Sequence, residues 1–348
     1  MSYTNGLDKP SDYFNTKLYT GNGATNRSIT GVGFQPDLTW IKARSDTTWH
    51  HLFDAVRGAN KALNSNVSNA EGTVATFPSF DSDGFTVNGA SSGNLNINNQ
   101  TNASWNWKAG TSFTNDASGT GIGSIDSAGS FNNDAGFSIC TFTGTGSAGT
   151  IKHGLNTVPK MIIVKGRSEA KAWTVYHSAL GAGKAIFLEQ TSASTTSDAY
   201  FGGTTPTSSV FSVGSSTNVT GNGITFVSYC FAEKKGYSKF GSYTGNGNAD
   251  GTFVYTGFKP AFIMVKNTST GGWQLRDNKR TTFNLLTNLN YANSSSAEQT
   301  TDGIDFLSNG WKLRNAAGDN NASGTAYIYM AFAENPFVTS TGVPATAR

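Results

Sequence analysis

Three segments of the chain share one pattern of apolar and polar positions. Each begins with an aromatic-Thr-Gly-Asn/Thr-Gly motif, reaches a proline 13 residues after the last glycine, and then a lysine six residues further on. The short apolar run between proline and lysine is typical of a β-strand that starts at a proline and ends at a charge. The motifs are Tyr19–Gly23, Phe142–Gly146 and Tyr243–Gly247, the prolines are Pro36, Pro159 and Pro260, and the lysines are Lys42, Lys165 and Lys266.

The match continues beyond each lysine, which distinguishes a repeat from a coincidence. A tryptophan follows at a similar distance in each copy, at Trp49, Trp173 and Trp273, and each copy closes on an alternating aromatic strand. The second copy starts 123 residues after the first (142 minus 19), and the third starts 101 after the second (243 minus 142). The additional 22 residues fall in a stretch rich in Gly, Ser, Thr and Asn, which predicts a linker at residues 111–135.

Composition indicates the fold class. The chain has 348 residues, 41 of them glycine, with 14% charged and 12% aromatic residues. Many turns between short strands are expected from this composition, whereas disorder would not produce regularly spaced aromatic strands. We therefore predict an all-β protein of three tandem β-sandwich or jelly-roll-like repeats with no substantial helix. The predicted divisions are an arm at 1–12, repeat 1 at 13–110, the linker at 111–135, repeat 2 at 136–236, repeat 3 at 237–337 and a tail at 338–348.

Each repeat is predicted to bury the apolar run before its lysine in a sandwich of its own. Leu38, Ile41, Ile163 and Val265 are expected to face inward. The joint between repeats 2 and 3 is short and partly apolar, which predicts that these two repeats dock rigidly. The strands predicted in repeat 1 are Phe14–Tyr19, Asp37–Ala43, His51–Val56, Thr73–Phe80, Phe85–Val87 and Ser104–Lys108.

Charge and hydropathy exclude several classes of partner. The net charge is +3, from 25 basic and 22 acidic residues, without the clustered basic face that nucleic-acid binding normally needs. The longest apolar stretch, residues 326–333, is far shorter than the roughly 20 residues of a membrane-spanning helix. The N-terminus has no basic region followed by an apolar one. The sequence thus predicts a soluble chain made in the cytoplasm, with no nucleic-acid partner and no membrane insertion.

No metal or cofactor site is predicted. The four histidines lack metal-binding spacing, and Asp81-Ser-Asp-Gly84 lacks the remainder of a calcium loop. Cys140 and Cys230 are interpreted as buried free thiols, since two cysteines do not form a disulfide framework.

Catalysis is not predicted either. No serine lies in a nucleophile-elbow motif. Glu71, Glu298 and Asp302 are candidate carboxylates for a glycosidase, but Glu71 and Glu298 stand at matching points of repeats 1 and 3. Residues that recur with a repeat are more simply explained by the fold than by one active site.

Surface recognition remains. Trp49, Trp173 and Trp273 follow the strand-ending lysines among polar residues, as expected of aromatic side chains that contact sugars or protein partners. The alternative interpretation is that each tryptophan starts the next strand and is buried.

Several longer motifs, taken together, give a resemblance to a known family. The chain resembles virion proteins of tailed bacteriophages, common in marine and cyanobacterial phages and described as tail-fibre-like or lectin-like, with a concanavalin-type sandwich. The resemblance covers nearly the whole chain and implies a structural particle protein, with a carbohydrate or host-surface ligand by analogy. The motifs are Tyr19–Gly23, Gly33–Lys42, Ser79–Phe85, Trp105–Gly110, Tyr237–Gly247 and Ala331–Phe337.

The expected function is that of a tail-fibre or tail-appendage component that can recognise a host-surface glycan. A capsid-surface knob is the alternative, because no heptad stalk is present, and a polysaccharide depolymerase is a third reading. By analogy with phage appendages, and because aromatic residues are abundant, a homo-oligomer is expected, with a trimer favoured.

Overall fold

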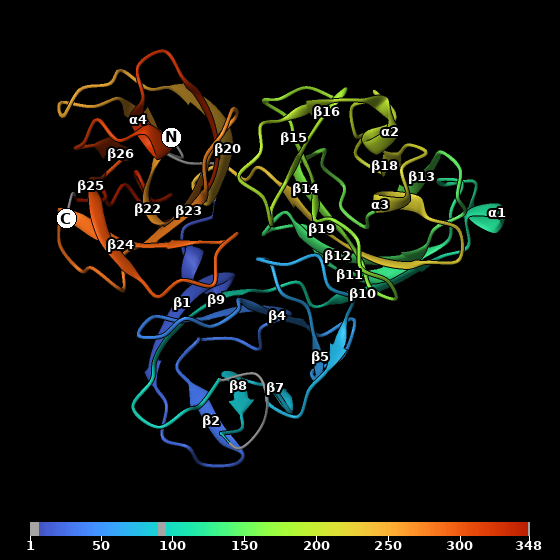
Figure 1. Cartoon of the computed structure of the whole chain (residues 1–348), viewed down its shortest axis with the longest axis horizontal. Coiled ribbons are helices and arrows are strands. Elements are labelled where there is room, and N and C mark those ends of the chain that lie inside the picture. The colour runs from blue at the N-terminus through green and yellow to red at the C-terminus, as the bar shows by residue number, and fades with distance from the viewer. Residues whose placement is uncertain (1–6, 90–94, 347–348) are drawn as a thin grey trace.

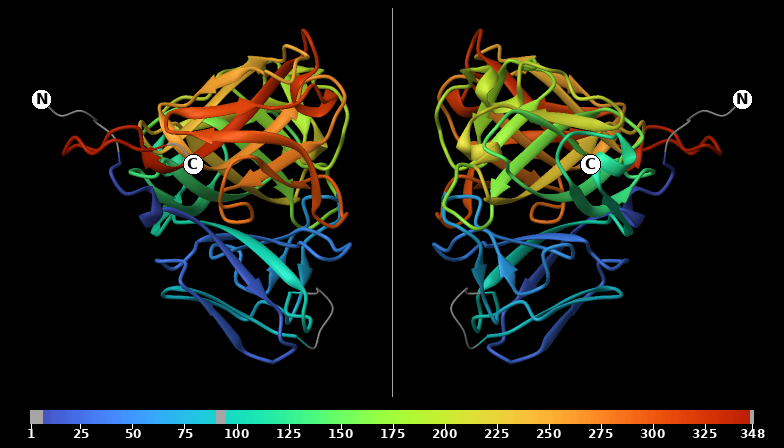
Figure 2. Two further views of the ribbon diagram at one scale, coloured as in Figure 1. Left: turned by 90° about the vertical axis from the view of Figure 1, so that its left-hand side faces the viewer. Right: turned by 90° about the vertical axis from the view of Figure 1, so that its right-hand side faces the viewer.

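The computed structural model describes residues 7–89 and 95–346, and its regular secondary structure is almost entirely antiparallel strands. Three lobes, one per repeat, surround a common centre (Figure 1). The side views place repeat 1 beneath the other two repeats, with all three in contact (Figure 2). The prediction of an all-β protein with three sandwich-like repeats is confirmed.

The same four-stranded sheet organises every repeat. From one side to the other, this sheet contains the repeat's first core strand, its last strand, the strand at or just after the proline of the repeated pattern, and the strand that follows that one in the chain. Each is antiparallel to its neighbours, so side chains alternate between the two faces of the sheet. The three copies are β1-β9-β3-β4, β12-β19-β14-β15 and β20-β27-β22-β23.

In repeat 1 a second, three-stranded sheet, β2-β8-β7, covers the outer face of this sheet. The predicted strand at Thr73–Phe80 is wrong in extent, since β6 ends at Thr73 and β7 begins at Ser79, beside Pro78, which has no N–H to donate. The elements are η1 Pro10–Asp12, β1 Phe14–Thr20, β2 Arg27–Thr30, β3 Leu38–Ala43, β4 His51–Asp54, β5 Lys61–Ala62, β6 Gly72–Thr73, β7 Ser79–Asp81, β8 Gly84–Val87 and β9 Thr101–Trp107.

In repeat 2 the sheet grows to eight strands, and β13 and β18 pair beside it. Short helical turns occupy two of the connections. The elements are β12 Phe137–Thr143, β13 Gly149–Lys152, β14 Pro159–Gly166, β15 Thr174–His177, β16 Lys184–Phe187, β17 Thr195–Thr196, α2 Asp198–Phe201, β18 Val210–Val213, α3 Thr217–Thr220 and β19 Thr225–Ala232.

In repeat 3 one eight-stranded sheet curls around the repeat's own core, in the order β20-β27-β22-β23-β24-β25-β26-β21. The elements are β20 Ser238–Thr244, β21 Phe253–Tyr255, β22 Phe258–Asn267, β23 Trp273–Asp277, β24 Leu286–Tyr291, β25 Gln299–Leu307, β26 Gly310–Leu313, α4 Gly318–Asn321 and β27 Ala326–Pro336.

The inner faces of the three sheets share one hydrophobic core at the centre of the molecule. Phe14 of repeat 1 stacks on Phe332 of repeat 3 with ring centroids 5.0 Å apart. Trp107 of repeat 1 meets Phe231 of repeat 2 at 6.3 Å and Phe262 of repeat 3 at 6.0 Å. Burying a large apolar side chain contributes about 1.5–3 kcal/mol. The repeats therefore cannot separate without exposing this core.

The four residues predicted to face inward are all buried, but in two different places. Leu38 and Ile163 belong to the shared central core. Ile41 belongs to the outer core of repeat 1, and Val265 to that of repeat 3. Every repeat thus buries both faces of its sheet, the outer one within the repeat and the inner one against its neighbours.

The expectation of a linker at 111–135 is corrected by the structure. Residues Thr111–Asn115 form β10, Ala117–Thr120 form α1 and Ser127–Asn132 form β11. β11 pairs with β12 and β10 pairs with β11, so the segment extends the sheet of repeat 2 by two strands. Within residues 7–89 and 95–346, neither repeat 1 nor repeat 3 has strands at this edge of its sheet.

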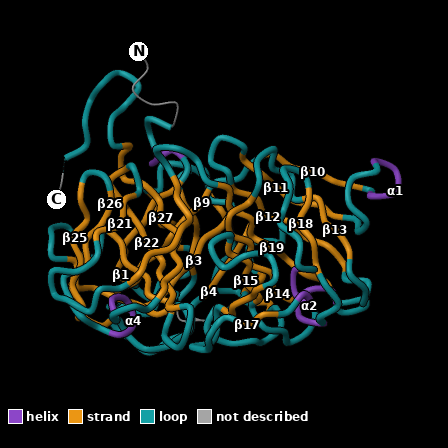
Figure 3. Tube along the Cα trace, turned by 90° about the horizontal axis from the view of Figure 1, so that it is seen from above, coloured by secondary structure: helices purple, strands orange, loops and turns teal. Residues whose placement is uncertain are grey.

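The described parts of the arm and tail lie together on one side of the molecule (Figure 3). Ser340 donates its backbone N–H to Asp8 at 2.7 Å. Within the described ranges, none of the helices has the length and apolar character needed to cross a membrane.

Candidate functional site

Two of the three predicted recognition tryptophans are interior residues. Trp173 and Trp273 are 0% and 1% exposed. Trp173 Nε1 donates to the carbonyls of Asn64 and Val67 in repeat 1, at 2.9 and 3.1 Å. Trp273 Nε1 donates to the carbonyl of Phe187 in repeat 2 at 2.9 Å. These indoles join neighbouring repeats and are not accessible to a ligand.

The third tryptophan, Trp49, is 47% exposed and precedes β4. Asp54, His177 and Asp277 hold the same position in the three repeats, because they pair with equivalent residues of β3, β14 and β22. Four residues before them stand His50, Trp173 and Trp273. His50, rather than Trp49, therefore matches the two tryptophans. His50 is fully buried, and its Nδ1 accepts a hydrogen bond from Trp40 at 2.9 Å. The match of Trp49 to the other two tryptophans is therefore wrong by one residue.

The carboxylates Glu71 and Glu298 also join repeats. Glu71 binds Arg57 of its own repeat and Arg167 of repeat 2, each at 2.9 Å. Burial would raise the pKa of Glu71, but hydrogen bonds from both arginines outweigh it and lower the pKa. A carboxylate held ionised by two guanidinium groups cannot serve as a general acid near neutral pH.

Glu298 has the same arrangement at the boundary between repeats 3 and 1. It binds Arg280 of its own repeat at 2.9 Å and Arg44 of repeat 1 at 2.8 Å. Burial alone would raise the pKa of Glu298. The hydrogen bond from Arg44 and the charge of Arg280 outweigh it, so the pKa lies below its ordinary value. Asp302, the third candidate, lies partly exposed on β25 with a positive φ of 50°.

The strand-ending lysines of the repeat are buried, a role that the sequence pattern did not reveal. Lys165 Nζ donates to the carbonyls of Gly166 and Lys171 and, across the repeat boundary, of Ser68 at 3.1 Å. Lys266 Nζ donates to Asn267 and, across its boundary, to Ser192 at 3.2 Å. Burial lowers the pKa of Lys42, Lys165 and Lys266 to about 8 each. These lysines hold loops of the fold.

The described residues contain no group of three or more histidine, cysteine, aspartate or glutamate side chains placed to hold a metal ion. Cys140 and Cys230 are buried free thiols, as predicted, and burial raises the pKa of each, that of Cys230 to about 12. A thiol in this state is a poor nucleophile.

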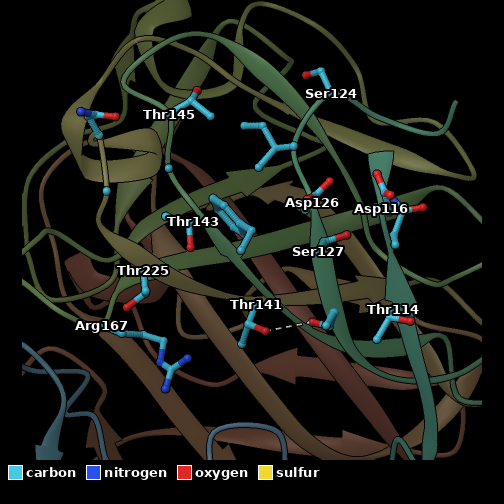
Figure 4. A pocket seen from close by; sticks show the side chains of 17 residues that line it. Thr114, Asp116, Ser124, Asp126, Ser127, Thr141, Thr143, Thr145, Arg167 and Thr225 are labelled. Atoms are coloured by element: carbon cyan, nitrogen blue, oxygen red, sulfur yellow. Dashed lines mark hydrogen bonds between the residues drawn. The ribbon is translucent and has the colours of Figure 1, made fainter. Parts of the chain in front are cut away.

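An open groove of about 930 Å³ lies on repeat 2. It runs along the added strands β10 and β11 and the end of β12, between the α1 connection and the turn at residues 221–225 (Figure 4). The residues lining it are Thr114, Asn115, Asp116, Ser124, Ile125, Asp126, Ser127, Ala128, Thr141, Phe142, Thr143, Gly144, Thr145, Arg167, Asn222, Gly223 and Thr225.

Local hydrogen bonds and one glycine fix the side of the groove that β10, α1 and β11 form. Asp116 caps α1 by accepting the backbone N–H groups of Ser118 and Gly119, both at 3.0 Å. Asp126 accepts the N–H of Ala117 at 2.8 Å and ties the two ends of the connection together. β11 can approach β12 closely because Gly129 has no side chain, since a Cβ there would lie 1.9 Å from the carbonyl oxygen of Ile139.

The groove offers hydrogen-bonding groups rather than reactive ones. The side chains of Thr114, Thr143, Thr225 and Asn222 face solvent at least in part, and within the described chain none of them hydrogen-bonds to another protein group. Arg167 lies at one end of the groove and Asp116 at the other (Figure 4). Hydroxyl and amide groups of this kind suit a ligand that carries many hydroxyls itself.

Sequence reasoning missed this site because its composition is that of a linker. A signal was present, however, since Ser127–Asn132 and Phe137–Thr143 are two short runs separated by the turn sequence Asn-Asp-Ala-Gly.

Comparison with known proteins gives one match. A family model described as a domain of unknown function (DUF7483) matches residues 9–336. The chain matches no curated protein and no solved structure.

Proposed function

The chain belongs to the DUF7483 family of domains of unknown function, and we propose that it is a structural component of a bacteriophage virion, in a tail fibre or tail appendage, that binds a host-surface glycan. The groove on repeat 2 is the proposed glycan site. The observation that carries the proposal is that β10, α1 and β11, which among the described residues only repeat 2 has, build a groove rich in hydroxyl and amide groups, four of which (Thr114, Thr143, Asn222 and Thr225) have no protein partner in the described chain. The resemblance to tailed-phage virion proteins supports the same role.

The chemistry of the groove favours binding over cleavage. Its only carboxylates, Asp116 and Asp126, accept backbone hydrogen bonds in the α1 connection. The two glutamates of the depolymerase reading are bound to arginines at repeat boundaries. We therefore propose that the purified chain binds host polysaccharide without releasing reducing ends, and an assay for reducing ends checks this.

The first test removes two groove contacts. We expect the double substitution Thr143→Val and Asn222→Ala to weaken glycan binding about tenfold, because each lost hydrogen bond is worth about 0.5–1.5 kcal/mol. Thr244→Val with Ser323→Ala is the matched control, since these residues hold the same positions in repeat 3, outside the groove. Binding of the purified protein to host cells measures the effect. Equal binding by both double variants and the native chain would remove the groove from the proposal.

A capsid-surface knob is the second candidate. It is favoured by the way the three repeats pack into one block around a shared core, which suits decoration of a surface. Immunolabelling of purified particles separates the candidates, because label at the tail supports the appendage and label over the capsid supports the knob.

Assembly of several chains is part of the proposal. Repeat 3 exposes Phe253, Tyr255, Phe283 and Leu285, with 42%, 54%, 75% and 44% of their surfaces accessible. Apolar side chains gathered on one repeat favour a contact between chains. We expect native mass spectrometry at micromolar concentration to show an oligomer, with a trimer as the leading species. Detection of monomer alone would contradict this part.

A further inference from the structure

The groove on repeat 2 has two aspartates that no basic side chain of the described chain neutralises. Asp116 and Asp126 are exposed and line the groove on the side that β10 and β11 form (Figure 4). Asp116 Oδ1 accepts the N–H groups of Ser118 and Gly119, and Asp126 Oδ1 accepts that of Ala117. Within residues 7–89 and 95–346, neither aspartate forms an ion pair and neither Oδ2 accepts a hydrogen bond. Hydrogen bonds from the Ser118 side chain and then from the Gly119 N–H lower the pKa of Asp116, so it is ionised at neutral pH.

Of the described residues that line the groove, Arg167 alone is basic, and it is already paired. Its Nε and Nη2 donate to the two carboxylate oxygens of Glu71 at 2.9 and 3.1 Å. Glu71 also binds Arg57, whose charge is balanced by Asp54. These two arginines and two carboxylates together carry no net charge. The groove therefore keeps the uncompensated negative charge of its two aspartates.

The rest of the described lining is uncharged. Its unpartnered hydroxyl and amide groups both donate and accept hydrogen bonds, as the hydroxyls of a sugar do. Ile125, Ala128 and Phe142 line the groove as well and offer apolar contact to the C–H faces of a sugar ring. This lining satisfies a glycan without using a charged group of the ligand.

We propose that the groove takes a polysaccharide without acidic groups and that Asp116 and Asp126 exclude acidic chains. This inference rests on the proposed function, since it names the class of glycan for the same groove. A carboxylate, sulfate or phosphate group on the glycan would lie near two like charges. The guanidinium that would bind such a group elsewhere is held here by Glu71.

Fractionation of the host's surface polysaccharide tests the class of ligand. The polysaccharide is passed over the immobilised full chain, and the retained fraction is applied to an anion exchanger at neutral pH. We expect the retained fraction to pass through the exchanger without binding. Retention of a fraction that binds the exchanger would overturn the inference.

Chemically modified forms of the same polysaccharide test the two aspartates. Carboxymethyl groups are attached to one sample and hydroxyethyl groups, which add similar bulk without charge, to another at equal substitution. In about 20 mM NaCl, where screening is weak, the native chain should bind the carboxymethyl form about fivefold more weakly. The double variant Asp116→Asn and Asp126→Asn should lose this difference, and asparagine keeps the side-chain oxygen that accepts the backbone N–H groups.

A matched control removes the same charge from repeat 2 outside the groove. Asp134→Asn with Asp198→Asn changes two exposed aspartates that do not line it, and this variant should keep the fivefold difference. In the native chain, about 500 mM NaCl should reduce the difference to less than about twofold, because salt screens exposed charges. This salt measurement decides if the groove variant does not fold.

The outcomes separate this inference from the proposed function. Equal binding of the two modified forms by the native chain would overturn the exclusion of acidic chains while leaving glycan binding intact. A difference that persists in the groove variant or in about 500 mM NaCl would do the same, since shape rather than charge would then be its cause. Absence of binding to the unmodified polysaccharide would overturn the proposed function, and the inference with it.

Discussion

The position of Trp173 and Trp273 links repeats 2 and 3 to the repeat that precedes each. Trp173 donates to carbonyls of repeat 1, and Trp273 donates to a carbonyl of repeat 2. His50 holds the matching place in repeat 1, and burial lowers its pKa well below the ordinary value, so its ring is neutral. The neighbouring Trp49, two residues before β4, is 47% exposed.

This difference predicts unlike effects for chemically identical substitutions. Trp173→Phe removes a buried indole whose N–H binds two carbonyls, and we expect it to reduce the free energy of unfolding by about 1–3 kcal/mol. Trp49→Phe, on the exposed side, should change it by less than about 0.5 kcal/mol. Urea unfolding of the two variants measures both values. A larger loss for Trp49→Phe than for Trp173→Phe would show that the placement of these residues is wrong.

At the scale of elements, three equivalent joints close the ring of repeats. The backbone N–H of Glu71 binds the carbonyl of Arg167 at 2.8 Å, that of Ser194 binds Thr268 at 2.9 Å, and that of Glu298 binds Arg44 at 2.8 Å. Two joints add glutamate–arginine pairs, whereas Ser194 and Thr268, the residues bonded at the joint between repeats 2 and 3, have neutral side chains. The backbone geometry is thus common to all three joints, and the charges are an addition at two of them.

We expect the free energy of unfolding to depend on the side chains of the two charged joints and not on the side chain of Ser194 at the third joint. Glu71→Gln leaves Arg57, which is fully buried, with less compensation, and should cost about 3 kcal/mol or more. Ser194→Ala is the matched control, because the joint there uses only the backbone of Ser194, and its effect should stay within about 0.5 kcal/mol. Guanidinium unfolding at neutral pH compares them. Similar losses in both variants would mean that the ion pairs contribute nothing specific.

At the scale of the whole molecule, the shared core makes folding a joint property of the repeats. Four histidines are buried in this assembly, and none is held by a carboxylate hydrogen bond among the described residues. Burial lowers the pKa of His51, His153 and His177 to about 4. In His177 the Nδ1 accepts the N–H of Ala179 and the Nε2 donates to the carbonyl of Tyr329 in repeat 3. This second hydrogen bond raises the pKa, but by less than burial lowers it.

The histidines predict loss of stability in mild acid. A histidine whose pKa falls on folding binds fewer protons in the folded than in the unfolded state between pH 6.5 and about 4. Stability is therefore complete above pH 6.5 and decreases as the pH falls, by up to about 1.4 kcal/mol per unit for each group. Calorimetry from pH 7 to 5 should show one transition moving to lower temperature, less steeply in His177→Gln. A transition temperature independent of pH over this range would contradict the prediction.

The repeats, the strand class and the burial of the apolar runs could be predicted from the sequence. Proline before each run and alternating aromatic residues act locally, so Pro159 and Pro260 begin or enter strands wherever the repeats lie. The buried free state of the cysteines also followed from composition, since each behaves as a small apolar residue. These features depend on the conformational preferences of short segments.

Tertiary structure alone decided which buried face met which partner. Leu38 and Ile41 have the same apolar pattern, yet one faces the centre of the molecule and the other its own sandwich. The groove arose because β11 could pair with the free edge of β12, and strand pairing depends on an available edge rather than on apolar residues. Its polar residues are suited to a linker and to a strand edge alike, so composition could not distinguish the two. The lysines, Trp173 and Glu71 took their roles from carbonyls and charges of another repeat, whose proximity is a property of the assembled chain and of no single segment.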